Sequence, residues 1–310
     1  MRPERGIALL TVLFILAVLT TLTAYLVADE AVFLRRVSNL RDGEQAWQLM
    51  RGSEAWARAV LRRDLREGAV DHLGEAWARL SEPVSVEGGA LQTRVEDAQG
   101  RFNLNNLRAG RDPVWYPAYR RLLAVLELDP ALADALVDWL DDDVLPSGAA
   151  GAEDGDYLAA SPPYRSANRR LAHTGELAWV AGYDAQVRAA LAPYVTALPA
   201  EGVRINVNTG ALPLLRILAS PPLTEDAARQ LVAGRGEGGY ATVEALLRQE
   251  ALAGQGAVAE RLAAVGSRYF LISSTARFGR AAGTLHSLAE RRGEGGSADV
   301  VILQRWRSLL

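Results

Sequence analysis

The chain has 310 residues, which is enough for two domains and a membrane anchor. It contains no cysteine, which excludes disulfides, thiolate catalysis and cysteine metal sites. All 34 basic residues are arginine, and the net charge of −3 argues against general affinity for nucleic acids, although a local basic patch would be compatible with it.

The N-terminus carries a membrane-spanning pattern. Residues 7–28 contain no charged side chain, and as a helix they would be about 33 Å long, enough to cross a hydrocarbon core of about 30 Å. A secretory signal peptide would carry its cleavage site after the apolar core, whereas the suggestive junction here, Gly6-Ile7, comes before it. An ordinary signal anchor and a basic leader that is cut after Gly6 are both compatible with this pattern.

A long helix and a strand hairpin follow the anchor. Apolar residues recur every three to four positions to about Leu65, which predicts one helix that continues from the membrane into the soluble region. Gly68 is expected to end it. Residues 84–87 and 91–96 alternate around Gly88-Gly89, which predicts two short strands joined by a turn.

The middle of the chain is predicted to be helical, and strands return at its end. Thr174 is a candidate N-cap for one of the helices. A loop is expected at 293–296. The predicted helices are 116–126, 130–140, 175–181, 185–192, 212–218, 225–233, 242–248 and 258–264, and the later strands are 268–274, 284–291 and 300–303. Strands on both sides of a helical block predict an α+β protein with an inserted all-α domain.

A short internal repeat supports this organisation. Residues 101–106 (Arg-Phe-Asn-Leu-Asn-Asn) match residues 204–209 (Arg-Ile-Asn-Val-Asn-Thr), and each copy precedes predicted helices. In both copies the asparagines can bond the local backbone and end the extended stretch.

Acidic side chains are concentrated in the middle of the chain. Residues 122–164 contain ten carboxylates but no Arg, Lys or His. Two acidic clusters lie nine residues apart in a stretch rich in Gly, Ala, Pro and Ser, so a loop can fold the second cluster back onto the first. Such crowded charges repel one another unless a cation lies between them, and their hard oxygens suit Ca²⁺, although the spacing is not that of an EF-hand. We therefore predict Ca²⁺ ligands at Asp138, Asp141, Asp142, Asp143, Glu153, Asp154 and Asp156, with a solvated acidic loop as the alternative.

The residues also bear on two other functions, catalysis and DNA binding. His173 has no neighbouring serine or cysteine nucleophile, and the crowded acids have no apolar wall that would raise one pKa for hydrolysis, so we predict no enzyme. Residues 206–211 resemble the start of a helix-hairpin-helix module, which binds DNA phosphates through hairpin amides. Pro221 and Pro222 remove those amides, so a packing module is favoured and a membrane-anchored DNA-binding protein is the alternative function.

Taken in order, these motifs resemble the type II secretion system minor pseudopilin K family over nearly the whole chain. The residues that carry the resemblance are the Gly6-Ile7 junction and anchor, Phe102–Asn105, Asp138–Asp141 with Gly151–Asp154, Pro162–Arg165, Ile205–Thr209 and Thr284–Ser287. The resemblance implies a pseudopilin fold, in which a long N-terminal helix packs on a small antiparallel sheet, with a large inserted all-α domain of helix-hairpin-helix or SAM-like units. The expected divisions are a leader at 1–6, a membrane-spanning helix at 7–28, helix and first strands at 29–105, the insertion at 106–266 and the remaining strands at 267–310.

The resemblance also implies a function. It predicts cleavage after Gly6 by prepilin peptidase, N-methylation of Ile7 and Ca²⁺ bound by the helical domain. It predicts a single-pass inner-membrane protein with a cytoplasmic N-terminus and a periplasmic bulk. Family members form a pseudopilus tip complex with minor pseudopilins I and J that initiates or caps assembly, and minor pseudopilin H and the major pseudopilin are further expected partners.

Thr11 fits a terminal position in such a fibre. Counted from Ile7, it is the fifth mature residue, where most pilins carry a glutamate that pairs with a neighbour's N-terminal ammonium. An intramembrane carboxylate is costly unless it is paired, so a subunit with no neighbour above it gains nothing from one. We expect the Thr11 hydroxyl to bond the helix backbone instead, and the bulky insertion to clash inside a packed fibre but not at its end.

Overall fold

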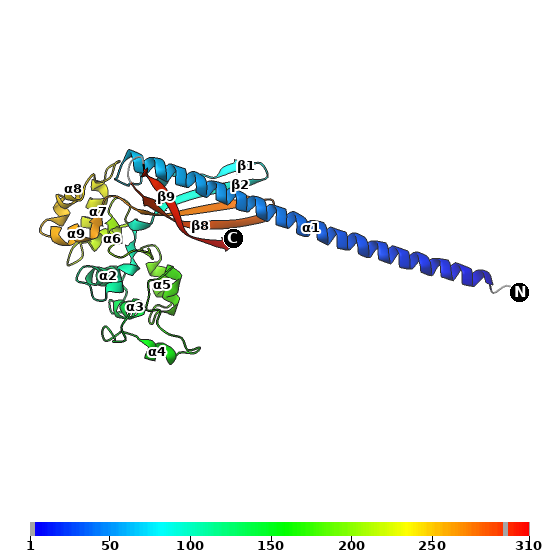
Figure 1. Ribbon diagram of the computed structural model, residues 1–310, viewed down its shortest axis with the longest axis horizontal. Helices are drawn as coiled ribbons and strands as arrows, with labels where there is room; N and C mark the ends of the chain where they lie inside the picture. The colour runs from blue at the N-terminus through cyan, green and yellow to red at the C-terminus, as the bar shows by residue number, and fades with distance from the viewer. Residues whose placement is uncertain (1–3, 294–296, 310) are drawn as a thin grey trace.

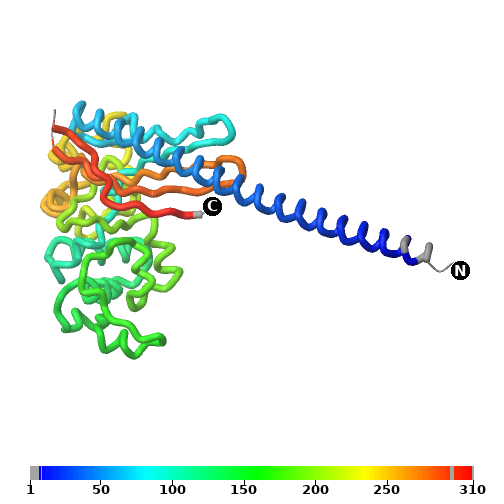
Figure 2. The backbone as a smooth tube through the Cα atoms, turned by 45° about the vertical axis from the view of Figure 1, so that its right-hand side comes forward, coloured from blue at the N-terminus to red at the C-terminus, as the bar shows by residue number. Residues whose placement is uncertain are grey.

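The computed structural model describes residues 4–293 and 297–309 (Figure 1). Residues 1–3 of the predicted leader and residues 294–296 of the predicted loop lie outside the described residues. The chain begins with α1, Glu4–Glu67, which extends far from the rest of the molecule before it reaches the sheet (Figure 2). The predicted continuous helix is thus confirmed, and it ends one residue before Gly68.

The last part of α1 packs on a five-stranded antiparallel sheet in the order β1-β2-β7-β8-β9. The bounds are Val84–Val86 for β1, Gly89–Asp97 for β2, Tyr269–Phe278 for β7, Ala281–Arg292 for β8 and Asp299–Leu309 for β9. The predicted hairpin and C-terminal strands are confirmed, but β9 is much longer than the expected 300–303. The sequence pattern did not predict the rest of this strand because charged arginines are typical of loops. In the structure these arginines contact α1: Arg305 binds Glu54 at 2.7 Å, and Arg307 lies 3.5 Å from the ring centroid of Trp47.

Between helix and sheet lies a small apolar core with polar contacts inside it. Ala57 and Leu61 of α1 are buried against Phe270 and Ile272 of β7. Hydrophobic burial of this kind supplies most of the stability of the contact. Nearer the N-terminal end of α1, Ser53 bonds the hydroxyls of Thr93 and Ser274 at 2.6 and 2.9 Å, so the buried polar groups are paired.

Between β2 and β7 the chain leaves the sheet and builds a helical insertion with two lobes (Figure 1). The excursion covers 98–268, slightly more than the range 106–266 expected from the sequence. The α-helices of the insertion are α2 (Trp115–Val125), α3 (Leu132–Leu140), α4 (Asp154–Leu158), α5 (Ala185–Leu191), α6 (Leu212–Arg216), α7 (Glu225–Gly234), α8 (Val243–Leu247) and α9 (Gly256–Leu262). Short 3₁₀ turns lie at η1 (Trp77–Arg79) before the sheet and, in the insertion, at η2 (Ala98–Gly100), η3 (Leu104–Ala109), η4 (Thr174–Trp179) and η5 (Glu250–Leu252).

Three local predictions need correction. The segment expected as a helix at 175–181 is the 3₁₀ turn η4, and its N-cap is His173, whose Nδ1 accepts a hydrogen bond from the Gly175 amide at 2.9 Å, rather than Thr174. Helix α4 was expected to be loop. The helix expected to end at 264 ends at Leu262, because the next two residues form the strand β6 (Ala263–Ala264).

The internal repeat is visible in the structure. In one copy β3 (Phe102–Asn103) pairs in parallel with β4 (Val195–Thr196), and in the other β5 (Ile205–Asn206) pairs in parallel with β6. The first asparagine of each copy accepts a hydrogen bond from a backbone amide two residues later, at 3.3 Å for Asn103 and 3.0 Å for Asn206. Each copy therefore opens one lobe with the same asparagine turn, as the sequence predicted.

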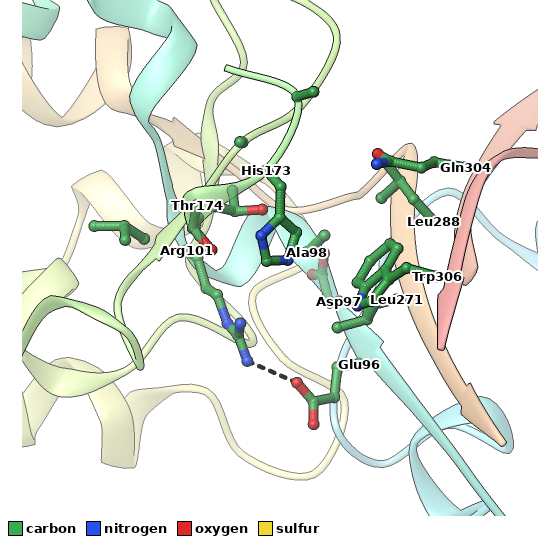
Figure 3. Close-up of a pocket in the computed structure, with 14 residues that line it drawn as sticks. Glu96, Asp97, Ala98, Arg101, His173, Thr174, Leu271, Leu288, Gln304 and Trp306 are labelled. Atoms are coloured by element: carbon green, nitrogen blue, oxygen red, sulfur yellow. Dashed lines mark hydrogen bonds and ion pairs between the residues drawn. The ribbon is translucent and has the colours of Figure 1, made fainter. Parts of the chain in front are cut away.

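One side of the insertion meets the sheet at a small cavity of about 80 Å³ (Figure 3). His173 projects from the insertion toward Trp306 of β9, with ring centroids 5.2 Å apart, and His286 of β8 stacks on the same indole. Nearby, Arg101 binds Glu96 at 2.7 Å. His173 thus joins the insertion to the sheet through its contact with Trp306.

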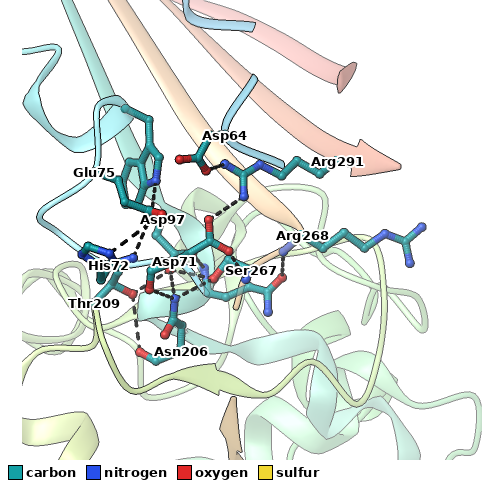
Figure 4. Close-up of polar contacts among 12 residues, drawn as sticks. Asp64, Asp71, His72, Glu75, Asp97, Asn206, Thr209, Ser267, Arg268 and Arg291 are labelled. Carbon is teal, nitrogen blue, oxygen red and sulfur yellow. Dashed lines mark hydrogen bonds and ion pairs between the residues drawn. The ribbon is translucent and has the colours of Figure 1, made fainter. Parts of the chain in front are cut away.

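A polar network ties together α1, the insertion and the sheet (Figure 4). The buried Asp97 carboxylate accepts hydrogen bonds from Asn206 Nδ2, Thr209 Oγ1 and Ser267 Oγ at 2.6–2.8 Å. Beside it, the buried Arg291 guanidinium pairs with Asp64 and Asp71. Since nearly every charge here has a partner, the network fixes the orientation of the insertion.

Candidate metal centre

Part of the acidic middle of the chain converges at the outer end of the first lobe. Asp138 lies in the last turn of α3, Asp141 is the C-cap of that helix, and Glu153 is the N-cap of α4. Carboxylate oxygens of Asp141, Asp143 and Glu153 all lie within 4.8 Å of one another. The intervening loop therefore folds the second acidic cluster back onto the first, as predicted.

Several oxygens at this place are buried and have no hydrogen-bond donor. They are Asp138 Oδ2, Asp141 Oδ1 and both carboxylate oxygens of Glu153, and the Glu153 side chain belongs to a residue that is only 6% exposed. A buried carboxylate without a donor or a cation is costly, so such groups normally have a partner. Hard, unsatisfied oxygens in this arrangement fit a divalent cation such as Ca²⁺.

The electrostatics point the same way. Burial, together with the charges of Asp138, Asp141 and Asp143, raises the pKa of Glu153 to about 7. Burial and the neighbouring acids raise the pKa of Asp141 to about 6. Each carboxyl thus resists ionisation, first because it is buried and then because its neighbours are acidic, and a bound cation would favour the ionised form.

The loop backbone is shaped around Asp138. The amide of Ser147 donates a hydrogen bond of 2.9 Å to Asp138 Oδ1. Gly151 passes so close to the Asp138 carboxylate that a Cβ at this position would collide with it. The missing side chain at Gly151 thus makes room for the Asp138 carboxylate, one of the predicted ligand groups.

Three of the seven predicted ligands are not part of this centre. Asp142 binds Arg108 at 2.6 Å. Asp154 binds Ser166 and Arg165, and these contacts, with the Ser166 hydroxyl first, lower its pKa. Asp156 accepts a hydrogen bond of 3.0 Å from the Glu153 amide and so caps α4. These three carboxylates are engaged by other groups, so the structure brings together only Asp138, Asp141, Asp143 and Glu153 of the seven predicted ligands.

An aromatic layer that was not predicted from the sequence lies behind the centre. Trp139 packs against Tyr157 with ring centroids 5.1 Å apart, and Tyr164 stacks at 5.2 Å on Tyr157 and meets Trp179 at 5.4 Å. This layer holds α3 and α4 together, and edge-on and tilted packing of this kind is favourable. The sequence contained an indication of this layer, because Trp139 and Tyr157 lie next to the acidic residues.

The membrane end of α1 agrees with an anchor. In the part of the chain that the structure describes, α1 is the one helix whose length and composition fit a membrane span, and none of its apolar window is buried within the molecule. Gly6 and Ile7 lie inside this helix. Thr11 Oγ1 donates a hydrogen bond of 3.2 Å to the Ile7 carbonyl, which is the backbone contact predicted for it.

The hairpin of the alternative DNA-binding function lies in the second lobe and makes a contact within it. The amide of Ser220, just before Pro221 and Pro222, donates to the side chain of Gln255 at 3.3 Å. This donor is therefore engaged within the lobe, and the prolines have no N–H. The geometry favours packing over phosphate binding.

Comparison with known proteins decides the family. Two family models, both described as type II secretion system (T2SS), protein K, match residues 100–200 and 205–265, which correspond to the two lobes. The type II secretion system protein K of Pseudomonas aeruginosa is 39% identical, with 95% of this chain and 91% of the relative aligned. The chain belongs to the type II secretion system protein K family. A member from Klebsiella pneumoniae is 36% identical over 94% of this chain and 93% of its own length.

A solved structure of a family member supports the fold. The crystal structure titled as the GspK-GspI-GspJ complex from the enterotoxigenic Escherichia coli type 2 secretion system contains a chain that matches with a TM-score of 0.79 and 26% identity. The match covers 88% of this chain and 99% of that chain. The long N-terminal helix on an antiparallel sheet, and the role of a minor pseudopilin in type II secretion, are therefore both supported for this chain.

Proposed function

We propose that this protein is the minor pseudopilin K at the tip of the pseudopilus, where it forms a complex with minor pseudopilins I and J and initiates or caps assembly. The observation that carries the proposal is the likeness to a chain that was solved as part of a K–I–J complex. The bulk of the helical insertion beside the sheet supports a terminal position, since it leaves little room for a subunit stacked above it (Figure 1). The protein acts by assembly, for the export of folded proteins across the outer membrane, rather than by catalysis.

The membrane topology is part of the proposal. Prepilin peptidase cleaves after Gly6, Ile7 is N-methylated, and α1 crosses the inner membrane once with its N-terminus in the cytoplasm. The exposed apolar part of α1 and the Thr11–Ile7 backbone contact support this placement. Minor pseudopilin H and the major pseudopilin are further partners in the assembled fibre.

The insertion binds Ca²⁺. Asp141, Asp143 and Glu153 would hold the ion, with Asp138 behind them, because these residues supply the clustered and unsatisfied oxygens. The ion supplies positive charge and oxygen coordination that join the end of α3 to the start of α4. Without it, four carboxyl groups are held together against their mutual repulsion.

The test is to purify the protein from cells that also produce minor pseudopilins H, I and J, and to determine its N-terminus by mass spectrometry. The proposal predicts co-purification of I and J and a methylated Ile7 as the first residue. An intact leader with no bound pseudopilin would contradict it. Salt-sensitive binding to DNA under the same conditions would favour the alternative of a membrane-anchored DNA-binding protein.

A further inference from the structure

The chain enters and leaves the helical insertion at one place on the sheet. The insertion begins after Asp97 of β2 and ends before Tyr269 of β7, and Asp97 pairs with Phe270 in the antiparallel register, so the two connections lie side by side. A body held by two adjacent connections can rotate about them unless other contacts fix it. The side chains around these connections therefore decide how firmly the insertion is held.

The segment that follows α1 supplies such contacts through Asp71. Its carbonyl accepts a hydrogen bond from Asn206 Nδ2 at 3.0 Å, and its carboxylate accepts one from the Ser267 amide at 2.6 Å. The Asp71 amide donates to the Val265 carbonyl at 2.9 Å. All three partners belong to the insertion, so Asp71 joins the second lobe and the returning chain to the segment at the end of α1.

Asp71 is one of several buried acids that lie close together (Figure 4). Oxygens of Asp64, Asp71 and Glu75 all lie within 4.8 Å of one another, and none of these side chains is more than 17% exposed. The Ser267 hydroxyl donates at 2.6 Å to a fourth buried acid, Asp97. Like charges this close repel one another strongly where water is excluded.

Positive charge compensates these four acids only in part. Arg291 pairs with Asp64 and Asp71, and among the described residues no other arginine forms an ion pair with any of the four. The side chain of Arg268 points away from them in Figure 4 and binds Glu290. One guanidinium therefore faces four acids.

Asp64 and Glu75 are the two acids that can share a proton. Asp64 Oδ2 faces Arg291, and Glu75 Oε2 accepts hydrogen bonds from the Trp77 indole and the His72 amide at 2.7 and 3.0 Å. His72 Nε2 lies 4.0 Å from Glu75 Oε1 and adds a positive charge there when the imidazole is protonated. A proton held between the remaining oxygens of the two carboxyls would remove one negative charge and give both oxygens a partner.

The pKa values agree with a retained proton. Burial raises the pKa of Asp64; the Arg291 charge opposes this effect and Glu75 adds to it. Burial also raises the pKa of Asp71 to about 7, against the effect of Arg291. Carboxyls this close titrate as a unit, so the proton belongs to the group rather than to one member.

We propose that this group of acids is a proton-dependent clamp that fixes the insertion on the sheet. With a proton between Asp64 and Glu75, the segment that carries Asp71 stays against the end of α1 and holds the insertion. When the proton is lost, the carboxylates repel one another, Asp71 moves away from Asn206 and Ser267, and the insertion is free to rotate. Since the pKa of Asp71 is raised from 3.8 to about 7, the stabilising effect is complete below 3.8 and is lost as the pH rises toward about 7.

The test measures the freedom of the insertion directly in the full-length protein. The sequence has no cysteine, so Ala59→Cys on α1 and Gln230→Cys on α7, both at exposed positions, can carry spin labels without interference. The distribution of label distances should widen as the pH rises from 3.8 to about 7. With Asp64→Asn it should stay narrow, because the new amide replaces the shared proton as a donor to Glu75 while the oxygen still accepts from Arg291.

Stability should follow the same change. The ratio of the unfolding equilibrium constants of the wild type and Asp64→Asn should increase over this window by at least about tenfold, the equivalent of one pKa unit. If Asp64→Asn does not fold, Glu75→Gln makes the same replacement from the other side and should give the same results. A distribution that stays narrow in the wild type, or that widens equally in the variant, would overturn the proposal.

Glu54→Gln is the matched control. Glu54 is a buried acid on the same helix; burial opposes its ionisation, but hydrogen bonds from Arg305 and Ser287 lower its pKa from 4.5. Its ionised form stabilises the fold, and this effect is lost as the pH falls. The control should therefore keep the widening seen in the wild type, and its ratio of unfolding constants should not increase with pH. An increase like that for Asp64→Asn would show that the effect is not specific to the clamp.

Discussion

The Asp97 carboxylate at the end of β2 accepts a hydrogen bond of 2.8 Å from the side-chain amide of Asn206, the first asparagine of the second repeat copy. The two residues belong to different parts of the fold, since β2 is a sheet strand and Asn206 opens the second lobe of the insertion. The bond therefore joins the insertion to the sheet through two residues that lie far apart in the sequence.

Removal of this carboxylate should loosen the junction. Asp97→Ala leaves the donors of Asn206, Thr209 and Ser267 buried without their shared acceptor, and we expect a loss of about 3 kcal/mol in the free energy of unfolding. Urea unfolding followed by tryptophan fluorescence measures this. Glu96→Ala is the control, because Glu96 lies at a partly exposed ion pair with Arg101 and its loss should cost less than about 1 kcal/mol. Equal losses for both variants would show that the network does not hold the junction.

Glu153→Gln should abolish the effect of Ca²⁺ on stability. The substitution keeps the size of the side chain but removes a charged ligand from the cluster. At a Ca²⁺ concentration of about 100 times Kd, one bound ion adds about 2.7 kcal/mol to the stability of the wild type. The measurement is the melting temperature with Ca²⁺ and with EDTA. Asp142→Asn, which removes a nearby carboxylate that is paired with Arg108, should keep the Ca²⁺ response, and the same melting temperature in Ca²⁺ and EDTA for the wild type would exclude the site.

The Ca²⁺ effect should also depend on pH. The pKa of Glu153 is raised from 4.5 to about 7 in the folded chain, so the ion-free folded state holds a proton more tightly than the unfolded state does. Its contribution to stability is present below about pH 4.5 and is lost as the pH rises toward 7. Ca²⁺ requires the ionised carboxylate, so the difference between the melting temperatures in Ca²⁺ and in EDTA should increase as the pH rises from about 4.5 to about 7. A difference that is constant over this range would contradict the assignment of Glu153 as a ligand.

Thr11→Glu should leave the soluble part folded and disturb assembly. Thr11 lies in the exposed N-terminal part of α1. This part of the helix extends away from the sheet and the insertion (Figure 2). An unpaired carboxylate in the membrane is costly, and in a subunit at the fibre end no neighbour above would supply an ammonium for it. We expect an unchanged melting temperature but reduced recovery of the tip complex and reduced secretion. Thr11→Ser keeps the hydroxyl and should behave like the wild type, whereas normal secretion by Thr11→Glu would count against the terminal position.

The elements that the sequence predicted well are those with a strong local signal. The periodicity of α1 and its end before Gly68 depend on neighbouring residues only, and so does the hairpin around Gly88-Gly89. The repeat was recognisable because each asparagine bonds its own backbone. In contrast, the length of β9 was underestimated because arginines are typical of loops. Only the contacts of Arg305 and Arg307 with α1 explain their place in a strand.

The candidate site was predictable as a region but not residue by residue. Which acids gather there depends on partners far away in the chain. Asp142 binds Arg108, which lies 34 positions earlier in the chain, and is therefore not in the cluster. Asp154 likewise binds Ser166 and Arg165. Helix α4 then turns Asp156 toward the Glu153 amide. None of these pairings follows from spacing alone.

The unbroken helix α1 sets both the distance and the rotation of the folded head relative to the N-terminal anchor segment. Its 64 residues span about 96 Å, and the described helix contains no break between anchor and sheet. One additional residue between Asp29 and Asp42 would lift the head by about 1.5 Å but would turn it by about 100°. The number of residues in this stretch therefore determines which side of the head a neighbouring subunit meets when both are anchored in the same bilayer.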